Sequence, residues 1–327
     1  MLIIGAGGYA VISNVGHHPA LPGDTKTQCL YSQHSITALR EFTTLTHRPI
    51  DCALVYNDAA PDWAAWDNPW FLSTTNPDKQ WARWKTQSPD RRLVIAPGIV
   101  PQDVPDDWRA RGASGEYDNH FHTLAAALIN AGLGDSIIRL AHEGNGEWFH
   151  DWFGPTAINQ QAWRTYWRRA VLAMRTTPGA HFTFDWNIAA GFDTVPLSWY
   201  YPGDDVVDII GFDYYDLDIM ANGATAHDPH RWTHQYTRHN GPADLIAFAN
   251  QHNKPLSIPE WGLVPTHTAH PGGGDNPAFV HGIAAIVHNH RVTYSGYFND
   301  PVGGTRLPLA AAPNSLTGYQ QEFGKAP

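Results

Sequence analysis

The chain has little cysteine, no cluster of positive charge and no long apolar run. Its 327 residues include two cysteines, and 21 Lys and Arg stand against 31 Asp and Glu, for a formal net charge of −10. A phosphate-binding surface needs clustered basic side chains, so the scattered Lys and Arg argue against nucleic acid and a membrane surface as partners. No apolar stretch approaches the roughly 20 residues that span a bilayer, so no membrane span is predicted.

The motifs of several cofactor and nucleophile sites are missing or incomplete. Residues 5–8 (GAGG) lack the full glycine spacing of a dinucleotide loop. The chain has 19 histidines but no HExxH zinc motif. It also lacks the GxSxG elbow of serine hydrolases, and both cysteines lie at or before the second predicted strand. The sequence therefore predicts no cofactor and no catalytic metal.

The cysteines and the N-terminal residues bear on the compartment. Cys29 and Cys52 form either a disulfide or two buried thiols, because the sequence does not give the distance that a bridge requires. Residues 1–12 are apolar, but no basic residue precedes Lys26. This segment therefore reads as a strand of the fold and not as a signal peptide.

Short apolar runs alternate with helical patterns along the chain. The predicted strands are residues 2–11, 51–56, 92–99, 136–141, 181–186, 206–212, 255–259 and 293–298. The predicted helices are residues 35–47, 117–131, 159–176, 242–253 and 277–290, with Ser35 as a cap and Gly132 as a terminator. Near-continuous apolar strands are typical of burial on both faces. Eight strands alternating with helices predict an α/β fold, a (β/α)8 barrel, with residues 1–327 as a single domain.

Two glutamates stand at the ends of the fourth and seventh predicted strands. Glu143 follows residues 136–141, and Glu260 follows residues 255–259. The active site of such a barrel lies at the C-terminal ends of its strands, and these two strands are on opposite sides of the mouth. Glycoside hydrolysis needs two facing carboxyl groups, about 5–5.5 Å apart for retention and further apart for inversion. Glu147 is a rival for the acid role, but it is predicted to lie in the following loop.

Three segments resemble glycoside hydrolase family 26, which includes β-mannanases. The segment RLAHEGNGEWF at residues 139–149 resembles the acid/base motif of that family. The segment PEWG at residues 259–262 resembles its nucleophile motif, and residues 201–215 resemble its strand-six segment. The three matches occur in the family's order, whereas residues 1–135 align only loosely.

The resemblance implies roles for four residues. Glu143 is the implied acid/base and Glu260 the implied nucleophile of a retaining reaction. His142 is implied to orient the nucleophile. Tyr215 is implied to donate a hydrogen bond to it, which would keep the carboxylate ionised.

Aromatic and polar residues near the strand ends are candidates for binding substrate. Aromatic rings stack on the apolar faces of sugars. The predicted sugar-binding residues are Trp148, Trp152, Trp186, Trp199, Trp261, Asn145 and Asp213. Residues 57–58 and 66–71 are further candidates for the wall of a cleft.

The predicted function is a β-mannanase-like endo-glycosidase that acts on a polysaccharide, as a monomer, in an extracellular or virion-associated location. Two departures from the family favour an alternative, the same chemistry on a cell-wall or capsular glycan by a phage-borne depolymerase. Residues 297–300 (YFND) stand where the family often has Trp, and the insert at residues 216–240 is rich in histidine. An alternative of another class is a barrel that binds carbohydrate without cleaving it.

Overall fold

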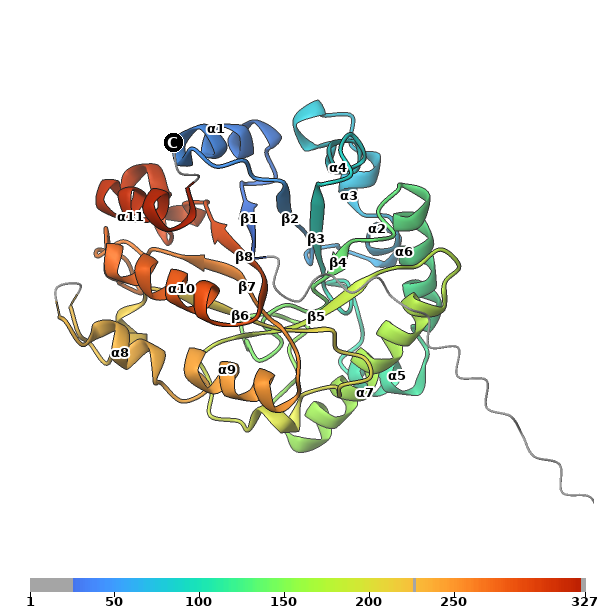
Figure 1. The fold of residues 1–327 in the computed structure, drawn as a ribbon. Coiled ribbons are helices and arrows are strands. Elements are labelled where there is room, and N and C mark those ends of the chain that lie inside the picture. Colours follow the sequence, from blue (N-terminus) through green and yellow to red (C-terminus); the bar gives the residue numbers. More distant parts are fainter. Residues whose placement is uncertain (1–25, 226–227, 325–327) are drawn as a thin grey trace, which may run out of the picture.

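A closed barrel of eight parallel strands forms the centre of the molecule (Figure 1). The computed structural model describes residues 26–225 and 228–324. The strands are β1 (Thr27–Tyr31), β2 (Cys52–Asn57), β3 (Arg92–Pro97), β4 (Ile137–Ile138), β5 (Thr183–Ala189), β6 (Ile209–Tyr215), β7 (Leu256–Gly262) and β8 (Val292–Phe298). Each strand pairs with the next, and β8 pairs with β1. The predicted (β/α)8 fold is confirmed.

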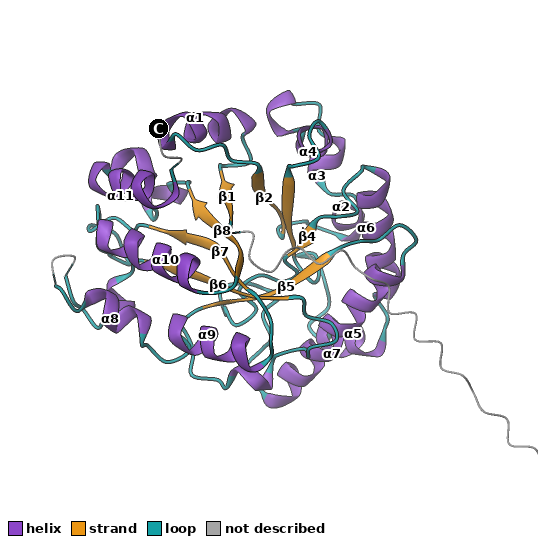
Figure 2. Cartoon of the chain, viewed as in Figure 1, coloured by secondary structure: helices purple, strands orange, loops and turns teal. Residues whose placement is uncertain are grey.

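Helices surround the barrel on its outer side (Figure 2). The α-helices are α1 (Ile36–Thr46), α2 (Trp63–Asp67), α3 (Trp70–Ser73), α4 (Trp81–Thr86), α5 (Trp108–Ser114), α6 (Asp118–Asn130), α7 (Ala157–Thr176), α8 (Arg231–Tyr236), α9 (Pro242–Gln251), α10 (Pro277–Asn289) and α11 (Pro313–Phe323). Short 3-10 helices are η1 (Pro77–Lys79), η2 (Leu197–Trp199), η3 (Asp218–Ala221), η4 (Val302–Gly304) and η5 (Leu309–Ala311).

The local signals for helix ends act as expected. The Ser35 hydroxyl accepts the backbone N–H of Ala38 at 3.0 Å and so caps α1. Gly132 follows α6 at a φ of 76°, a left-handed conformation that glycine adopts without strain. All five predicted helices are confirmed, with shifts of one or two residues at their ends.

The first strand differs from the prediction. Residues 2–11 lie outside the described residues, and β1 (Thr27–Tyr31) takes the first place in the barrel, hydrogen-bonded to both β2 and β8. This segment opens with two polar residues, Thr27 and Gln28, so its hydropathy is weaker than that of residues 2–11. Gln28 is buried because its amide oxygen accepts from the Ser295 hydroxyl of β8, a partner that hydropathy does not identify. The other seven predicted strands are found at their expected places, but β4 (Ile137–Ile138) is shorter than predicted, and β5, β6 and β7 each end three residues later than predicted.

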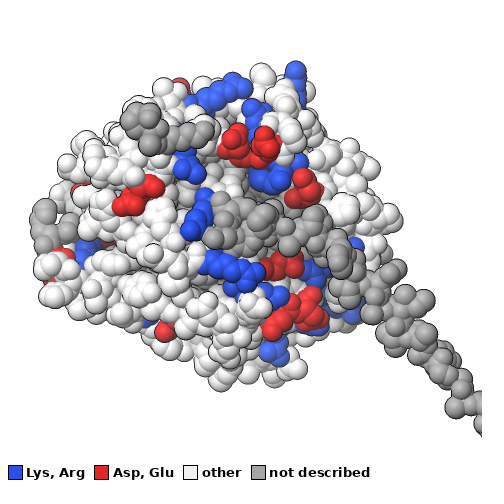
Figure 3. Space-filling model, in the orientation of Figure 1, with Lys and Arg blue, Asp and Glu red and all other residues white. Residues whose placement is uncertain are grey.

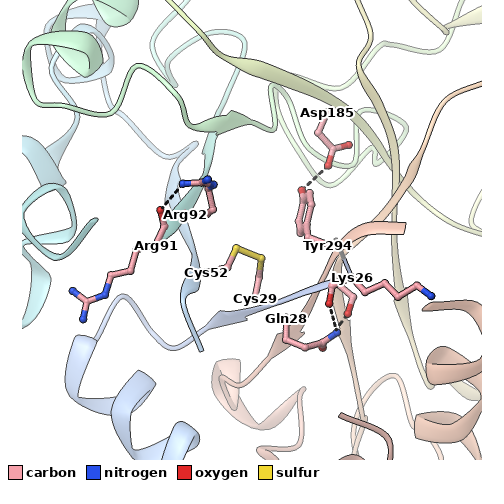
Figure 4. The surroundings of a disulfide bond; sticks show 9 residues. Lys26, Gln28, Cys29, Cys52, Arg91, Arg92, Asp185 and Tyr294 are labelled. Atoms are coloured by element: carbon pink, nitrogen blue, oxygen red, sulfur yellow. Dashed lines mark hydrogen bonds between the residues drawn. A yellow bond between two sulfur atoms is a disulfide. The ribbon is translucent and has the colours of Figure 1, made fainter. Parts of the chain in front are cut away.

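The interior of the barrel holds a disulfide and a buried carboxyl group (Figure 4). Cys29 of β1 and Cys52 of β2 lie at paired positions, are fully buried and form a disulfide. Of the two states that the sequence left open, the structure therefore has the disulfide. The Asp185 carboxyl group accepts hydrogen bonds from Ser257 and Tyr294, while its burial raises its pKa to about 6.

Charges of both signs are mixed on the surface that Figure 3 displays. Lys and Arg lie close to Asp and Glu on that face, in keeping with their scatter along the sequence. Among the described residues, no helix has both the length and the apolar character for crossing a membrane.

Replacing both cysteines by alanine is expected to lower the free energy of unfolding by about 2–4 kcal/mol. The bridge spans a sequence separation of 23 residues, and it restricts the unfolded chain. Urea denaturation of the wild type and the Cys29→Ala/Cys52→Ala variant measures the difference. As a control, wild-type protein denatured in the presence of a reductant should lose the same amount. Equal stability of variant and wild type would contradict the prediction.

Candidate active site

The structure brings Glu143 and Glu260 together at the mouth of the barrel. Glu143 follows β4, and Glu260 lies in β7. One carboxylate oxygen from each of Glu143, Asp213 and Glu260 lies within 4.8 Å of the other two. Both glutamates are buried, so their charges interact in a medium that screens poorly.

The Glu260 carboxylate is held by three donors. Arg139 Nη1 donates to Oε1 at 2.6 Å, and the Tyr56 hydroxyl donates to the same oxygen at 2.7 Å. The Tyr215 hydroxyl donates to Oε2 at 2.7 Å, as the resemblance implied. Burial alone would raise the pKa of Glu260, but the Arg139 charge, His142 and the two phenols outweigh it and lower the pKa to about 2. Glu260 is therefore an anion at neutral pH.

The pKa of the Glu143 carboxyl group is shifted upward, opposite to that of Glu260. Burial and the negative charge of Glu260 raise its pKa to about 7. The Arg139 charge and a hydrogen bond from Trp148 Nε1 to Glu143 Oε2, at 2.9 Å, act in the other direction but do not cancel the rise. A carboxyl group with this pKa can hold and give a proton near neutral pH.

The backbone that carries Glu143 is strained. Ala141 and Glu143 have φ values of 50° and 48°, a left-handed conformation that costs a non-glycine residue of order 1–3 kcal/mol. The backbone N–H of Glu143 donates to Asn187 Oδ1 at 2.8 Å, which fixes this turn against β5. A Cβ at Gly146 would lie 2.5 Å from the Trp148 ring, so glycine at this position leaves room for that ring beside Glu143.

A buried arginine joins the acidic groups below the mouth. The fully buried Arg139 binds Asp213 and Glu260 in two ion pairs, and its Nη2 donates to Asn187 Oδ1 at 2.9 Å. Asp213 Oδ1 accepts the backbone N–H of Glu260 and the Asn187 amide, each at 3.1 Å. These bonds fix the Glu260 backbone and side chain independently.

Asp213 and Asn145, which were predicted to bind substrate, form hydrogen bonds with other parts of the protein. Asp213 is buried and bonded to Arg139, Asn187 and the Glu260 backbone, so it supports the site from below. The Asn145 amide bonds the backbone N–H and C=O of Ala189 at 2.8 and 2.9 Å and also donates to Asp193. The structure therefore places both side chains in hydrogen bonds within the protein, and contact of Asp213 or Asn145 with substrate stays a prediction.

Two predicted sugar-stacking tryptophans are core residues. Trp186 and Trp261 are fully buried and cannot offer a ring face to a sugar. Side chains alternate along a strand, and Trp261 follows Glu260, which points into the mouth. Its ring therefore points outward and packs on Tyr319 of α11. Trp186 likewise lies between two inward residues of β5 and packs on Tyr201.

The other three predicted tryptophans differ in their surroundings. Trp148 is 51% exposed, bonds Glu143 and lies 5.0 Å from the exposed Phe192 ring, so it borders the catalytic pair. Trp152 is half-buried, and its carbonyl accepts two hydrogen bonds from Arg109. Trp199 is 54% exposed on η2, where its carbonyl accepts from Arg164 of α7.

His142 lies between the end of β2 and the catalytic pair. Its ring meets the Tyr56 ring edge-on at 5.3 Å, and its Nε2 is 3.8 Å from Asp58 Oδ2. Burial and the nearby Arg139 charge lower its pKa, which favours the neutral ring. Orientation of the nucleophile by His142 stays a prediction.

Three residues of the site were missed in the sequence. Tyr56 ends the predicted strand 51–56, and Asn187 directly follows the predicted strand 181–186, so their positions at strand ends were a usable signal. Arg306 comes from the loop after β8 and stacks its guanidinium 3.8 Å from the centre of the Tyr215 ring. No local pattern marks Arg306, because the chain's path beyond β8 decides its contact.

A cavity of about 290 Å³ opens beside Tyr56. Its walls come from the ends of β1 and β2 and from the α2–α3 segment, and they consist of His34, Tyr56, Asn57, Asp58, Ala59, Ala60, Pro61, Ala65, Asn68 and Trp70. Residues 57–58 and part of 66–71 thus line a cavity beside Tyr56, and their contact with substrate stays a prediction. Trp70 Nε1 donates to the Tyr56 carbonyl at 2.9 Å, so its ring is held in a fixed direction.

The three carboxylates are close enough together to be considered as metal ligands. Arg139 already binds two of them, Asp213 and Glu260, so a cation from the protein itself balances their charge. This arrangement suits a reaction that needs one ionised and one protonated carboxyl group.

Comparisons with known proteins agree with the fold and with the sequence motifs. Residues 122–259 match the family described as glycosyl hydrolase family 26. A mannan endo-1,4-beta-mannosidase from Bifidobacterium adolescentis is 29% identical over 121 residues, which cover 35% of this chain and 12% of that protein. The matched part is thus a small fraction of that relative's length.

Two solved structures show the same architecture along most of the chain. The Bacillus subtilis mannanase BCman has a TM-score of 0.61 and 16% identity, over 93% of this chain and 88% of that one. A modular endo-beta-1,4-mannanase from Cellulomonas fimi has a TM-score of 0.65 and 15% identity, over 93% and 72% of the two chains. Such low identities establish the fold alone. The resemblance seen in the sequence is confirmed over residues 122–259, which match the model of glycosyl hydrolase family 26 and lie within a (β/α)8 barrel.

Proposed function

We propose that this protein is a retaining glycoside hydrolase that cleaves β-1,4-mannosidic bonds inside a polysaccharide. The family match supports the class of enzyme, a glycosidase. The observation that carries the mechanism is the pair of buried carboxyl groups with oxygens within 4.8 Å, whose surroundings lower the pKa of Glu260 and raise that of Glu143. Retaining enzymes hold these groups about 5–5.5 Å apart and inverting enzymes about 6.5–9.5 Å apart, so the short gap favours retention.

In the first step, a Glu260 oxygen attacks the anomeric carbon. Glu143 gives its proton to the glycosidic oxygen, the bond from that oxygen to the anomeric carbon breaks, and a glycosyl ester forms on Glu260. Tyr56, Tyr215 and Arg139 keep Glu260 ionised and aimed before the attack.

In the second step, Glu143 acts as a base, because formation of the ester on Glu260 lowers the Glu143 pKa. The esterified Glu260 has no negative charge, so one of the two main causes of the high Glu143 pKa disappears. The Glu143 carboxylate then takes a proton from water, and the water oxygen attacks the anomeric carbon and releases Glu260. Two inversions at that carbon leave its configuration unchanged.

The two sides of the site are assigned to the two parts of the substrate. The leaving sugar lies at the acid Glu143, where Trp148 and Phe192 offer exposed rings for stacking. The sugar that becomes attached to Glu260 lies toward the cavity beside Tyr56. The named activity of the Bifidobacterium relative supports mannan as the polymer.

The same chemistry on another glycan is the second candidate. Phe298 stands in the region where the family often has Trp, and its ring packs 4.5 Å from Tyr31 at the mouth.

The buried disulfide supports action in an oxidising compartment, so we place the enzyme outside the cytosol.

The first test removes each carboxylate in turn. Glu143→Gln is expected to lower kcat by about 10²–10⁴-fold, because the leaving oxygen then receives no proton from the enzyme. Glu260→Gln is expected to abolish turnover, because an amide is a poor nucleophile. Release of reducing ends from β-mannan and from a panel of cell-wall and capsular glycans measures both.

The matched control for this test is Glu147→Gln, a change of the same kind in the exposed part of the loop. Its rate should stay within about twofold of wild type. Full activity of either catalytic variant would refute the two-carboxylate mechanism. Cleavage of another polymer but not of mannan would select the second candidate, and binding without cleavage of any glycan would indicate a binding barrel.

The stereochemistry is a second prediction. The first product released from a β-linked oligosaccharide should be the β-anomer, because the double displacement retains configuration. Proton NMR spectra recorded within the first minutes, before mutarotation, distinguish the anomers. Initial formation of the α-anomer would show inversion and exclude a covalent ester on Glu260.

The third prediction concerns pH. The value of kcat/KM should fall as pH rises through about 7, because Glu143 then loses the proton that it must donate. Trp148→Phe removes a hydrogen bond that lowers the Glu143 pKa, so the alkaline limb should move to higher pH. Trp63→Phe on α2 is the control and should leave the limb unchanged. An alkaline limb that moves down in Trp148→Phe would contradict this assignment.

A further inference from the structure

A buried carboxylate, Asp216, directly follows Tyr215 at the end of β6. It is fully buried and accepts hydrogen bonds from Arg231 Nε at 2.8 Å, Gln235 Nε2 at 2.7 Å and Asn276 Nδ2 at 2.8 Å. Arg231 and Gln235 belong to α8, and Asn276 directly precedes α10. We call these four residues the Asp216 clasp. The clasp connects the end of a catalytic strand to two separate segments of the outer layer.

The pairing of β6 with β7 is irregular just before Tyr215 and at Glu260. The register of β6 against β7 shifts between Gly211 and Tyr214. Proline at position 259 has no N–H to donate, and the N–H of Glu260 donates to the Asp213 side chain. The ladder is therefore weak at this level of the barrel.

Regular pairing resumes where Tyr214 meets Trp261 and Tyr215 meets Gly262, and it continues to Asp216. Its backbone N–H donates to the Gly262 carbonyl of β7 at 3.1 Å. Its own carbonyl accepts the N–H of Gly273 at 3.1 Å. Asp216 thus joins both strand ends just beyond Tyr215 and Glu260.

The loop at Gly272 and Gly273 packs directly against Asp216. A Cβ at Gly273 would lie 2.2 Å from Asp216 Oδ2, and a Cβ at Gly272 would lie 2.2 Å from the Asp216 carbonyl oxygen. Two adjacent glycines therefore allow the loop to close directly over the carboxylate.

We propose that Asp216 is a positioning residue that holds Tyr215 where its hydroxyl donates to Glu260. The insert at residues 216–240 acts through Arg231 and Gln235 as the outer half of the clasp, so it bears on catalysis and not only on the choice of sugar. The kinetic part of this inference rests on the proposed function, because Glu260 is its nucleophile. The geometric part concerns the distance between Tyr215 and Glu260 and stands without a substrate.

A double-mutant cycle tests the kinetic part. Asp216→Asn is expected to lower kcat at least about tenfold with KM within about twofold, because the hydrogen bond from Tyr215 is lost at the nucleophile. In a Tyr215→Phe background the same change should lower kcat by less than about twofold, because residues that act through one bond are not additive. An equal loss in both backgrounds would overturn the proposal, since it would show that Asp216 does not act through Tyr215.

Asp218→Asn is the matched control. Asp218 Oδ1 accepts from Arg231 Nη1 at 2.8 Å, so this change removes the other carboxylate of the same arginine, but it leaves the strand end untouched. Its kcat should stay within about twofold of wild type. A loss as large as that of Asp216→Asn would show that the effect does not depend on the carboxylate at the strand end, and it would overturn the proposal.

A crystal structure of Asp216→Asn tests the geometric part. The Tyr215 hydroxyl lies 2.7 Å from Glu260 Oε2 in the wild type, and this distance should exceed about 3.5 Å in the variant. If Asp216→Asn does not fold, Gln235→Met removes one donor at similar volume and should lengthen the same distance. An unchanged distance overturns the proposal, whereas an enzyme inactive on every glycan would refute only the proposed function.

Discussion

The buried guanidinium of Arg139 is the interaction on which the site depends. It lies at the centre of the barrel between Asp213 and Glu260 and has no contact with solvent. Removing one partner of such a buried ion pair typically costs about 3–5 kcal/mol, because it leaves a charge without compensation. The same positive charge holds Glu260 in its ionised state. Stability of the barrel interior and readiness of the nucleophile therefore have a common physical origin.

The different pKa values of the two glutamates follow from their neighbours. Both are buried, and burial alone would raise the pKa of each. Glu260 receives three hydrogen bonds from Arg139, Tyr56 and Tyr215, whereas the side chain of Glu143 receives one, from Trp148. The negative charge of Glu260 then acts on Glu143 across a short distance and favours its protonated form. The pKa values of two chemically identical side chains are therefore shifted in opposite directions.

The parts of the chain around this pair are constrained more tightly than their sequence suggests. The β4 loop holds Ala141 and Glu143 in left-handed conformations, and Asn187 of β5 fixes the second of these turns through its side chain. The end of β6 is tied to β7 through Asp216. Strain and irregular pairing are common where a site requires a backbone path that regular strands do not offer. In this barrel, buried side-chain hydrogen bonds compensate for the backbone bonds that are missing.

The sequence by itself determined the barrel class, seven of the eight strands, and the placement of Glu143 and Glu260 at strand ends. These features depend on local signals, namely apolar runs, helix caps and short motifs. The tertiary structure decided which strand comes first, since Gln28 of β1 needs Ser295 of β8 as a partner. It also decided that Trp186 and Trp261 are core residues, and that Arg306 belongs to the site. Such facts depend on which distant segments meet in space, and a hydropathy pattern contains no information about that.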